Sequence, residues 1–235
     1  MTNHKTRIII SVGGSLIVPN GGIDTSFLSQ LNTFIRSQIA AHKDRQFFLI
    51  TGGGATAREY IDAGKSVVGH QLADDDMDWL GIHSTRLNGH LVRTIFRDIA
   101  HPVMIKDFDV IRKINEPVTV AAGWKPGRSS DFVAVQIAED YDASLVINMS
   151  NITQAYDKDP AKFDDAKPID HIQWTDFKRI VGDKWTPGLS MPFDPIASKK
   201  AAQLSLTVAI MGRDFDNLQA FLDKESSFVG TIITA

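Results

Sequence analysis

Short apolar runs alternate along the chain with longer segments in which apolar side chains recur at helical spacing. The runs are rich in β-branched residues and predict strands buried on both faces of a sheet, at residues 7–12, 46–51, 103–105, 118–122 and 144–149. The longer segments predict amphipathic helices at 25–43 and 74–99, others that begin near 54 and 131, and a short helical piece between 105 and 118. Strand, loop and helix repeat in this order. The pattern therefore predicts an α/β fold, a three-layer αβα sandwich around a mostly parallel central sheet.

The pattern becomes less regular after residue 150. Residues 157–168 and 182–192 are polar and rich in turn-forming residues. Helices are predicted at 174–181, 195–204 and 218–222, and strands at 207–211 and 230–233. The chain contains no linker, low-complexity tract or internal repeat that would divide it. We expect one domain over residues 1–235, with two functional halves that meet near Met149.

Three predicted strands end in loops that can bind anions. Residues 52–54 are three glycines between a strand and a helix, where free backbone N–H groups and the helix dipole attract an anion and no Cβ holds it away. Arg58 follows one turn later and could reach back over the same anion. Residues 13–15 and 123–131 form similar loops, and the carboxyl ends of parallel strands meet at one edge of a sheet. Three loops offer more anion-binding groups than a single phosphate needs, which predicts phosphoryl transfer between two phosphorylated ligands. Alternatively, the three glycines only form a tight connection.

Composition narrows the possible partners. The 235 residues are 43% hydrophobic and 23% charged, with a formal net charge of -3, so no basic field favours nucleic acid or an anionic membrane. There is no cysteine for a disulfide or a thiolate site. The first residues are polar, and the first apolar run is too short for a signal peptide or a membrane span. We expect a cytoplasmic protein with small-molecule partners.

Two other nucleotide-binding patterns fit poorly. The Gly-x4-Gly-Lys-Ser/Thr pattern of P-loop enzymes is absent. Gly52-x-Gly54-x-x-Ala57 matches a loose dinucleotide fingerprint, but it belongs to the second strand–helix unit, and no strand ends in an acid about twenty residues later. The histidines lack metal-ligand spacing, so no protein-built metal site is expected, and Mg²⁺ would arrive with ATP.

An ordered set of motifs covers nearly the whole chain. The motifs are Gly13-Gly14-Ser15-Leu16, Gly52-Gly53-Gly54-x-x-Ala57-Arg58-x-Tyr60-Ile61, Asp78-x-x-Gly81-Ile82-x-x-Thr85-Arg86, Asp194-Pro195-x-Ala197-x-Lys199 and Gly230-Thr231-x-Ile233. Taken together, the set resembles the amino-acid kinase superfamily, and within it the uridylate kinase family of archaeal-type pattern.

The resemblance implies ATP-dependent phosphorylation of UMP to UDP in pyrimidine nucleotide biosynthesis, with Mg²⁺ carried by ATP, in a homohexamer. It implies ATP contacts from Gly14, Ser15, Gly54, Arg58, Ser150, Asn151, Tyr156 and Asp159. It implies UMP contacts from Gly53, from Asp78 at the ribose hydroxyls, and from the loop Trp124, Lys125, Pro126, Gly127, Arg128, Ser129 and Ser130. Catalytic roles would fall to Arg58, Lys199 and Ser15, although Lys199 can equally be a solvated lysine beside Lys200.

The chain departs from the family pattern at two points. Ser11 stands where the bacterial-type enzyme has a lysine, which the archaeal type also lacks, and Thr153-Gln154 replaces an Asp-Gly pair after the fifth strand. The second departure leaves open a non-catalytic nucleotide-binding or oxyanion-storing protein on the same fold. A sister kinase for another small acceptor, such as isopentenyl phosphate, is also open, although Asp78 and the loop after Gly123 favour a nucleotide over an apolar chain.

Overall fold

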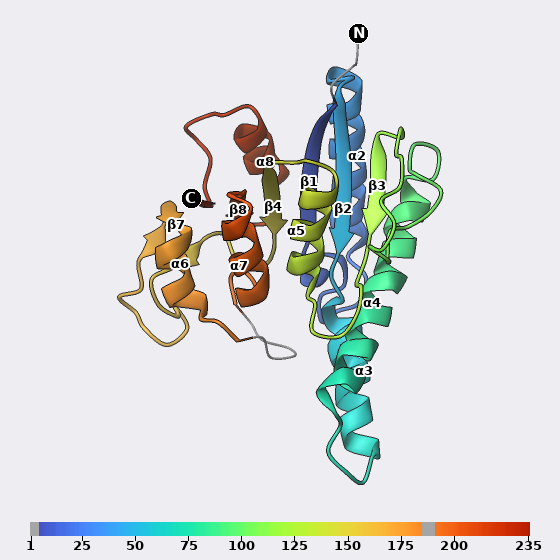
Figure 1. The fold of residues 1–235 in the computed structure, drawn as a ribbon, viewed down its shortest axis with the longest axis vertical. Helices are drawn as coiled ribbons and strands as arrows, with labels where there is room; N and C mark the ends of the chain where they lie inside the picture. The colour runs from blue at the N-terminus through green and yellow to red at the C-terminus, as the bar shows by residue number, and fades with distance from the viewer. Residues whose placement is uncertain (1–4, 185–190) are drawn as a thin grey trace.

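A seven-stranded sheet runs through the centre of the computed structural model, which describes residues 5–184 and 191–235 (Figure 1). Its strand order is β3-β2-β1-β4-β8-β9-β7. The first five strands in this order are parallel, β9 is antiparallel to β8, and β7 is parallel to β9. The strands are β1 (Thr6–Val12), β2 (Arg45–Thr51), β3 (Val118–Ala121), β4 (Leu145–Met149), β7 (His171–Gln173), β8 (Thr207–Met211) and β9 (Thr231–Thr234). A separate two-stranded sheet pairs β5 (Ala155–Tyr156) with β6 (Pro168–Ile169).

Helices cover both faces of the large sheet, because successive side chains of a strand point to opposite faces. On β1, Ile8 and Ile10 belong to one buried cluster and Ile9 to the other. The first cluster packs against α2 (Thr25–Ala41), α4 (Asp74–Ile95) and α8 (Phe215–Leu222). The second packs against α5 (Ser130–Asp140), α6 (Trp174–Val181) and α7 (Pro195–Gln203). The predicted three-layer αβα sandwich with a mostly parallel sheet is confirmed.

Two helices lead away from the sheet. A short helix, α1 (Gly14–Ile17), follows β1. The helix α3 (Gly54–Val67) and the start of α4 pack against each other and extend beyond the carboxyl ends of the strands (Figure 1). Only Ala55 of α3 is fully buried. Within residues 5–184 and 191–235, no helix combines the length and apolar character needed to cross a bilayer.

The segment between α4 and β3 differs from its prediction. Residues 103–105 are not a strand: Ile105 makes only an isolated bridge to Ala121, and the run follows Pro102, which has no N–H to donate to a neighbouring strand. No helix forms between 105 and 118, where Val110 and Ile111 are exposed.

Other element boundaries also differ from those predicted from the sequence. α4 ends at Ile95 rather than near 99, in a turn. The helix α1 and the strands β5, β6 and β7 are too short to show a periodic pattern and were not predicted. Part of the loop predicted at 182–192, namely 185–190, lies outside the described residues, as do residues 1–4 of the polar N-terminal segment.

Candidate active site

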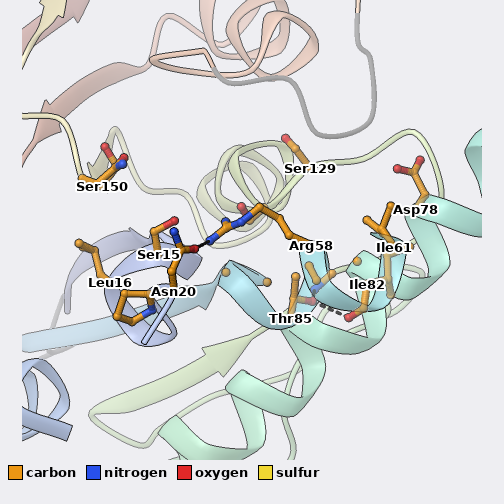
Figure 2. Close-up of a pocket in the computed structure, with 18 of the residues that line it drawn as sticks. Ser15, Leu16, Asn20, Arg58, Ile61, Asp78, Ile82, Thr85, Ser129 and Ser150 are labelled. Carbon is orange, nitrogen blue, oxygen red and sulfur yellow. Dashed lines mark hydrogen bonds between the residues drawn. The ribbon is translucent and has the colours of Figure 1, made fainter. Parts of the chain in front are cut away.

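A cleft of about 1040 Å³ lies where the strand order reverses, beyond the carboxyl ends of the parallel strands. From β1 the chain proceeds outward through β2 to β3, then crosses to β4 and β8 on the other side of β1. Such a switch point opens a crevice between the loops of neighbouring strands. The loops after β1, β2, β3, β4 and β8 all line the cleft, so the structure brings the three predicted glycine-bearing loops together and adds two more (Figure 2).

The loops after β1 and β2 pack backbone against backbone. A Cβ at Gly14 would lie 2.0 Å from the Gly54 nitrogen, and one at Gly52 would lie 2.4 Å from the Gly14 nitrogen. Gly54 also has a φ of +65°, a left-handed conformation that favours glycine. These glycines are therefore required by packing, a reason that the sequence pattern did not reveal. Gly14 itself does not line the cleft, whereas Ser15, Gly53 and Gly54 do.

The start of α3 presents its backbone to the cleft. The first N–H groups of a helix have no carbonyl one turn earlier, and they attract anions. The Ala55 N–H is satisfied by the Val18 carbonyl, with N and O 2.8 Å apart. Gly53, the N-cap residue, and Gly54, the first helical residue, line the cleft. This geometry favours a phosphate at Gly53 and Gly54.

Arg58 lies on the second turn of α3 and reaches across the cleft toward the loop after α1 (Figure 2). Its Nη2 donates to Oδ1 of Asn20, 2.7 Å away, and both residues line the cleft. Because the partner is a neutral amide, the guanidinium is oriented while its charge stays uncompensated. Sequence reasoning missed Asn20, whose only signal was its place in a Pro-Asn-Gly-Gly loop.

Asp78 marks the other end of the cleft. The acids at 74–76 are exposed in the first turn of α4, but Asp78 is half-buried and lines the cleft. Its Oδ2 accepts a hydrogen bond from the Gly127 N–H at 2.6 Å. Gly127 has a φ of +74° and therefore takes a left-handed conformation to make this contact. The carboxylate thus links α4 to the loop that follows β3.

A second contact fixes the same loop. Arg86 of α4 donates from Nε to the Gly123 carbonyl at 3.0 Å and from Nη2 to the Trp124 carbonyl at 2.9 Å. The Thr85 hydroxyl accepts from the Gly123 N–H at 2.8 Å. Burial lowers the pKa of the Arg86 guanidinium. Arg86 is a positioning residue to which the sequence pattern assigned no role.

The loop residues predicted to contact UMP divide into two groups. Arg128, Ser129 and Ser130 line the cleft, whereas Trp124, Lys125, Pro126 and Gly127 do not. The Trp124 ring packs against Phe108 with centroids 5.1 Å apart, and the Lys125 ammonium lies 4.1 Å above the Trp124 ring.

Arg128 and Ser129 have further structural partners. The Arg128 guanidinium lies 4.5 Å from the Phe132 ring centroid, and its Nε is buried without a hydrogen-bond partner among the described residues. The Ser129 hydroxyl accepts from the Phe132 N–H and caps α5. Both residues therefore help to shape the loop as well as the cleft.

Five of the residues predicted for the ATP side or for catalysis lie in three different places. Ser150 and Asn151 line the cleft beyond β4. Tyr156 lies in β5 and Asp159 is exposed and paired with Lys162; neither lines the cleft. Lys199 is exposed on α7 and lines a different hollow of about 240 Å³. Helical phase explains this, because Ala197, Ser198 and Ala201 form the buried face of α7. The structure brings Ser15 and Arg58 together and leaves Lys199 apart.

The Thr153-Gln154 departure separates into two positions. Thr153 lines the cleft beside Gly212. Gln154 is bound elsewhere, since its Nε2 donates to Oδ1 of Asp170 at 2.8 Å and to the Gly230 carbonyl at 3.2 Å. Gln154 is thus a structural link to the loop before β9, not a group in the cleft.

Two acids lie beside the cleft at the starts of α5 and α7, the half-buried Asp131 and the buried Asp194. Asp131 accepts from the Ser11 hydroxyl at Oδ1 and from the Asp194 N–H at Oδ2, both at 3.2 Å. Burial, and then the charge of Asp194, raises the pKa of Asp131 to about 7. Burial also raises the pKa of Asp194, which caps α7 through the Ala197 N–H at 2.6 Å. Ser11, the position of a lysine in the bacterial-type pattern, therefore serves here as a hydrogen-bond donor.

A cleft lined by glycine-bearing loops at the switch point of a mostly parallel sheet is typical of α/β proteins that bind phosphorylated ligands. The chain belongs to the amino acid kinase family, whose family model matches residues 6–211. The uridylate kinase of Staphylothermus marinus is 34% identical over 212 residues, 88% of this chain and 89% of that protein. That of Methanocorpusculum labreanum is 31% identical over 232 residues, 97% of this chain and 95% of that protein.

Solved structures agree with this assignment. The crystal structure of uridylate kinase from Archaeoglobus fulgidus has a TM-score of 0.78 and 25% identity, and covers 98% of this chain and 100% of that chain. The UMP kinase from Bacillus anthracis has a TM-score of 0.73 at 17% identity, over 97% of this chain and 96% of that chain, a likeness of fold alone. The resemblance indicated by the ordered motifs is confirmed.

Proposed function

We propose that the protein transfers the γ-phosphoryl group of ATP to UMP and releases UDP and ADP. The observation that carries the proposal is the cleft itself, in which N–H donors and Arg58 lie between a half-buried carboxylate at one end and hydroxyl and amide groups at the other. Residues 1–149 form the acceptor half and residues 150–235 the ATP half. The names of the relatives at 30% identity or more support the same reaction.

The acceptor half holds and orients UMP. Asp78 accepts hydrogen bonds from the ribose hydroxyls, and the Gly53 N–H group binds the phosphate. Arg128, Ser129 and Ser130 cover the nucleotide from the loop fixed by Arg86. Phosphoryl transfer depends on such positioning, because the protein need not form a covalent bond.

The transfer occurs between the two halves. A UMP phosphate oxygen forms a bond to the γ-phosphorus while the bond to the β-phosphate oxygen breaks, and ADP leaves with that electron pair. Ser15, Gly54 and Arg58 stabilise the negative charge spread over the moving group. The Asn20 contact holds Arg58 in place before the substrates bind, so little reorganisation is needed in the transition state.

In the ATP half, Ser150 and Asn151 offer the donor a hydroxyl and an amide group. None of the described residues that line this end of the cleft carries a carboxylate. Mg²⁺ prefers phosphate oxygens and water to a dedicated protein cage, so the lining fits an ion that enters bound to ATP. No three His, Asp or Glu side chains of the described residues group into a metal site.

Two alternatives are weaker. A sister kinase for isopentenyl phosphate needs an apolar pocket. Ile61, Met77 and Ile82 line the cleft near Asp78, but Asp78, Arg128 and the two serines add charged and polar groups that an isoprenoid chain would leave without partners. A non-catalytic nucleotide- or oxyanion-binding protein was suggested by Thr153-Gln154, but Gln154 is bound to Asp170 and Gly230 and leaves the space of the donor free.

The experiment is to measure nucleoside diphosphate formation from ATP and Mg²⁺ with UMP, CMP, dUMP and isopentenyl phosphate offered separately. Turnover selective for UMP supports the proposal. Turnover with isopentenyl phosphate alone would replace it with the sister kinase. ATP binding in a calorimeter without any turnover would replace it with the non-catalytic protein.

Three properties extend the proposal to the level of the cell. The reaction would serve pyrimidine nucleotide biosynthesis in the cytoplasm, and the assembly would be a homohexamer. These follow from the family resemblance. Light scattering of the purified chain tests the assembly, since a mass other than six chains would contradict it.

A further inference from the structure

Arg213 is a cation of the cleft with no role in the phosphoryl transfer described above. It follows β8 and lines the cleft together with Gly212 and Thr153. Its side chain is 54% exposed, and only Nη2 is engaged in a hydrogen bond within the described residues, so Nε and Nη1 are free to donate. A guanidinium held by one corner can still present a pair of N–H groups to a phosphate.

The charges of the cleft are unevenly distributed. Its lining contains four charged side chains among the described residues, Arg58, Asp78, Arg128 and Arg213. Asp78 lies at the acceptor end and Arg58 crosses the middle (Figure 2). Arg128 also belongs to the acceptor end, because it follows Gly127, whose N–H donates to Asp78. β8 lies beyond β4 in the sheet, so the loop after β8 is on the donor side. With Lys199 on the outside of α7, Arg213 is a second cation, besides Arg58, that the described lining offers to a bound triphosphate.

The start of α2 holds Arg213 in position. Nη2 of Arg213 donates to Oδ2 of Asp24 at 2.9 Å, and the guanidinium carbon lies 5.6 Å from the Phe27 ring centroid. Oδ1 of the same carboxylate accepts from the Phe27 N–H at 2.8 Å and caps the helix. The Phe27 N–H and the Arg213 guanidinium lower the pKa of Asp24, so the carboxylate stays ionised at neutral pH. Asp24 thus restrains a flexible side chain from the other half of the protein, which reduces the entropy lost on binding.

We propose that Arg213 binds the β- and γ-phosphates of the donor nucleotide, and that Asp24 is its positioning residue. This inference rests on the proposed function for the identity of the donor. Nε and Nη1 donate to phosphate oxygens while Nη2 stays on Asp24. The contact with Asp24 already joins the loop after β8 to the start of α2, so it ties Arg213 of the ATP half to the acceptor half before the nucleotide binds.

The experiment compares nucleotide binding and steady-state kinetics in the full-length chain. ATP, ADP and AMP are titrated calorimetrically into the wild type, Arg213→Ala, Arg213→Lys and Asp24→Asn. Arg36→Gln is the matched control, because Arg36 on α2 also pairs with an aspartate, Asp98 at 2.7 Å, but does not line the cleft. Thermal unfolding of each variant reports on the structural part of the ion pair.

The expected result is selective for phosphates. Arg213→Ala weakens ATP and ADP binding by about tenfold or more, the scale of a lost charged hydrogen bond, while AMP binding changes less than about twofold. Arg213→Lys keeps the charge without the fork and recovers part of the loss. KM for ATP rises and KM for UMP stays within about twofold, and Arg36→Gln binds ATP as the wild type does.

Other results would overturn the inference. Equal losses of thermal stability in Arg213→Ala and Asp24→Asn, with all nucleotide affinities within about twofold of the wild type, would make the ion pair purely structural. An equal loss for AMP and ATP would place Arg213 at the nucleoside instead. ATP binding that depends on Arg213 without any turnover would retain this inference and reject the proposed function, whereas a wild type that binds no ATP would reject both.

Discussion

Asp131 Oδ2 lies 3.2 Å from the backbone nitrogen of Asp194, so the carboxylate that begins α5 accepts a hydrogen bond from the residue that caps α7. The two acids are close enough that the charge of Asp194 adds to burial in raising the pKa of Asp131 to about 7. At this junction Asp131 links Ser11 of the acceptor half to Asp194 of the ATP half. One titratable side chain, Asp131, therefore contacts both halves of the protein at this junction.

This pKa makes stability depend on pH. The pKa of Asp131 in the folded state, about 7, lies above the ordinary aspartate value of 3.8, so the folded state retains a proton that the unfolded state loses. The stability that this proton contributes is complete below about pH 4 and is lost as the pH rises to about 7. Burial also raises the pKa of Asp194, so its contribution to stability changes with pH in the same direction. The Ala197 N–H and, to a smaller extent, the Arg128 charge lower that pKa.

Asp131→Asn should abolish most of this dependence. An asparagine can donate from Nδ2 to the Ser11 hydroxyl and accept from the Asp194 N–H, so both contacts survive. We expect the variant to be more stable than the wild type by about 1–3 kcal/mol at pH 7.5. This is less than the full pKa shift would give at ~1.4 kcal/mol per pKa unit. The difference in stability should shrink as the pH falls toward 4. Urea unfolding at several pH values measures this. A difference that is constant with pH would show that Asp131 does not titrate in this range.

Arg58→Ala should impair catalysis more than binding. The guanidinium is fixed over the cleft by Asn20, so its loss removes a preorganised charge from the transition state. We expect kcat/KM for UMP phosphorylation to fall, and the fall to correspond to a loss of about 2–4 kcal/mol of transition-state stabilisation. Asn20→Ala should cost less, because the charge remains and only its orientation is lost. Near-normal kcat/KM in Arg58→Ala would remove this residue from the catalytic group.

Asp78→Asn should raise the KM for UMP. The amide keeps the size of the side chain but loses the charge and half of the acceptor capacity that the ribose hydroxyls and the Gly127 N–H share. An increase of about tenfold, with KM for ATP nearly unchanged, is expected from the loss of a charged acceptor. Asp76→Asn is the control, because this neighbour in the same helix is exposed. Equal effects of the two substitutions would indicate a general electrostatic change.

Lys199→Ala distinguishes the sequence pattern from the structure. The family motif suggests a catalytic lysine, whereas the side chain is exposed on α7 and lines a separate hollow. The structure predicts that kcat/KM changes less than about threefold, as for other solvated surface residues. A loss comparable to that in Arg58→Ala would require the ATP half to rotate α7 toward the cleft during the reaction.

The sequence predicted the features that depend on local pattern. Buried strands and the loops after them follow from apolar runs and glycines, so the mostly parallel sheet and the positions of Gly53 and Arg58 in the cleft could be anticipated, whereas Asp78 was expected there only from the family resemblance. Contacts between segments far apart in the chain could not. Asn20 orients Arg58 across 38 residues, and Asp24 pairs with Arg213 across 189, and neither partner carries a periodic or motif signal.

Helical phase and chain direction explain the other differences. Lys199 fits the family motif by spacing, but the side of α7 that faces the sheet is set by Ala197 and Ala201. Likewise, the run at 230–233 predicts a strand but contains no information that β9 is antiparallel to β8.

Gly14→Ala tests whether the glycines serve packing or anion binding. A methyl group at Gly14 would lie 2.0 Å from the Gly54 nitrogen, and backbone on both sides leaves no room for adjustment. We expect a loss of stability of about 3 kcal/mol or more, at the upper end of single substitutions, measured by urea unfolding in the absence of nucleotide. Gly21→Ala is the matched control, since a Cβ there meets nothing within 4 Å and φ is not left-handed, and it should change stability by less than about 0.5 kcal/mol. If Gly14→Ala instead folds as stably as the wild type but loses ATP affinity, the glycine serves the nucleotide, and the close packing of the two loops is not what requires it.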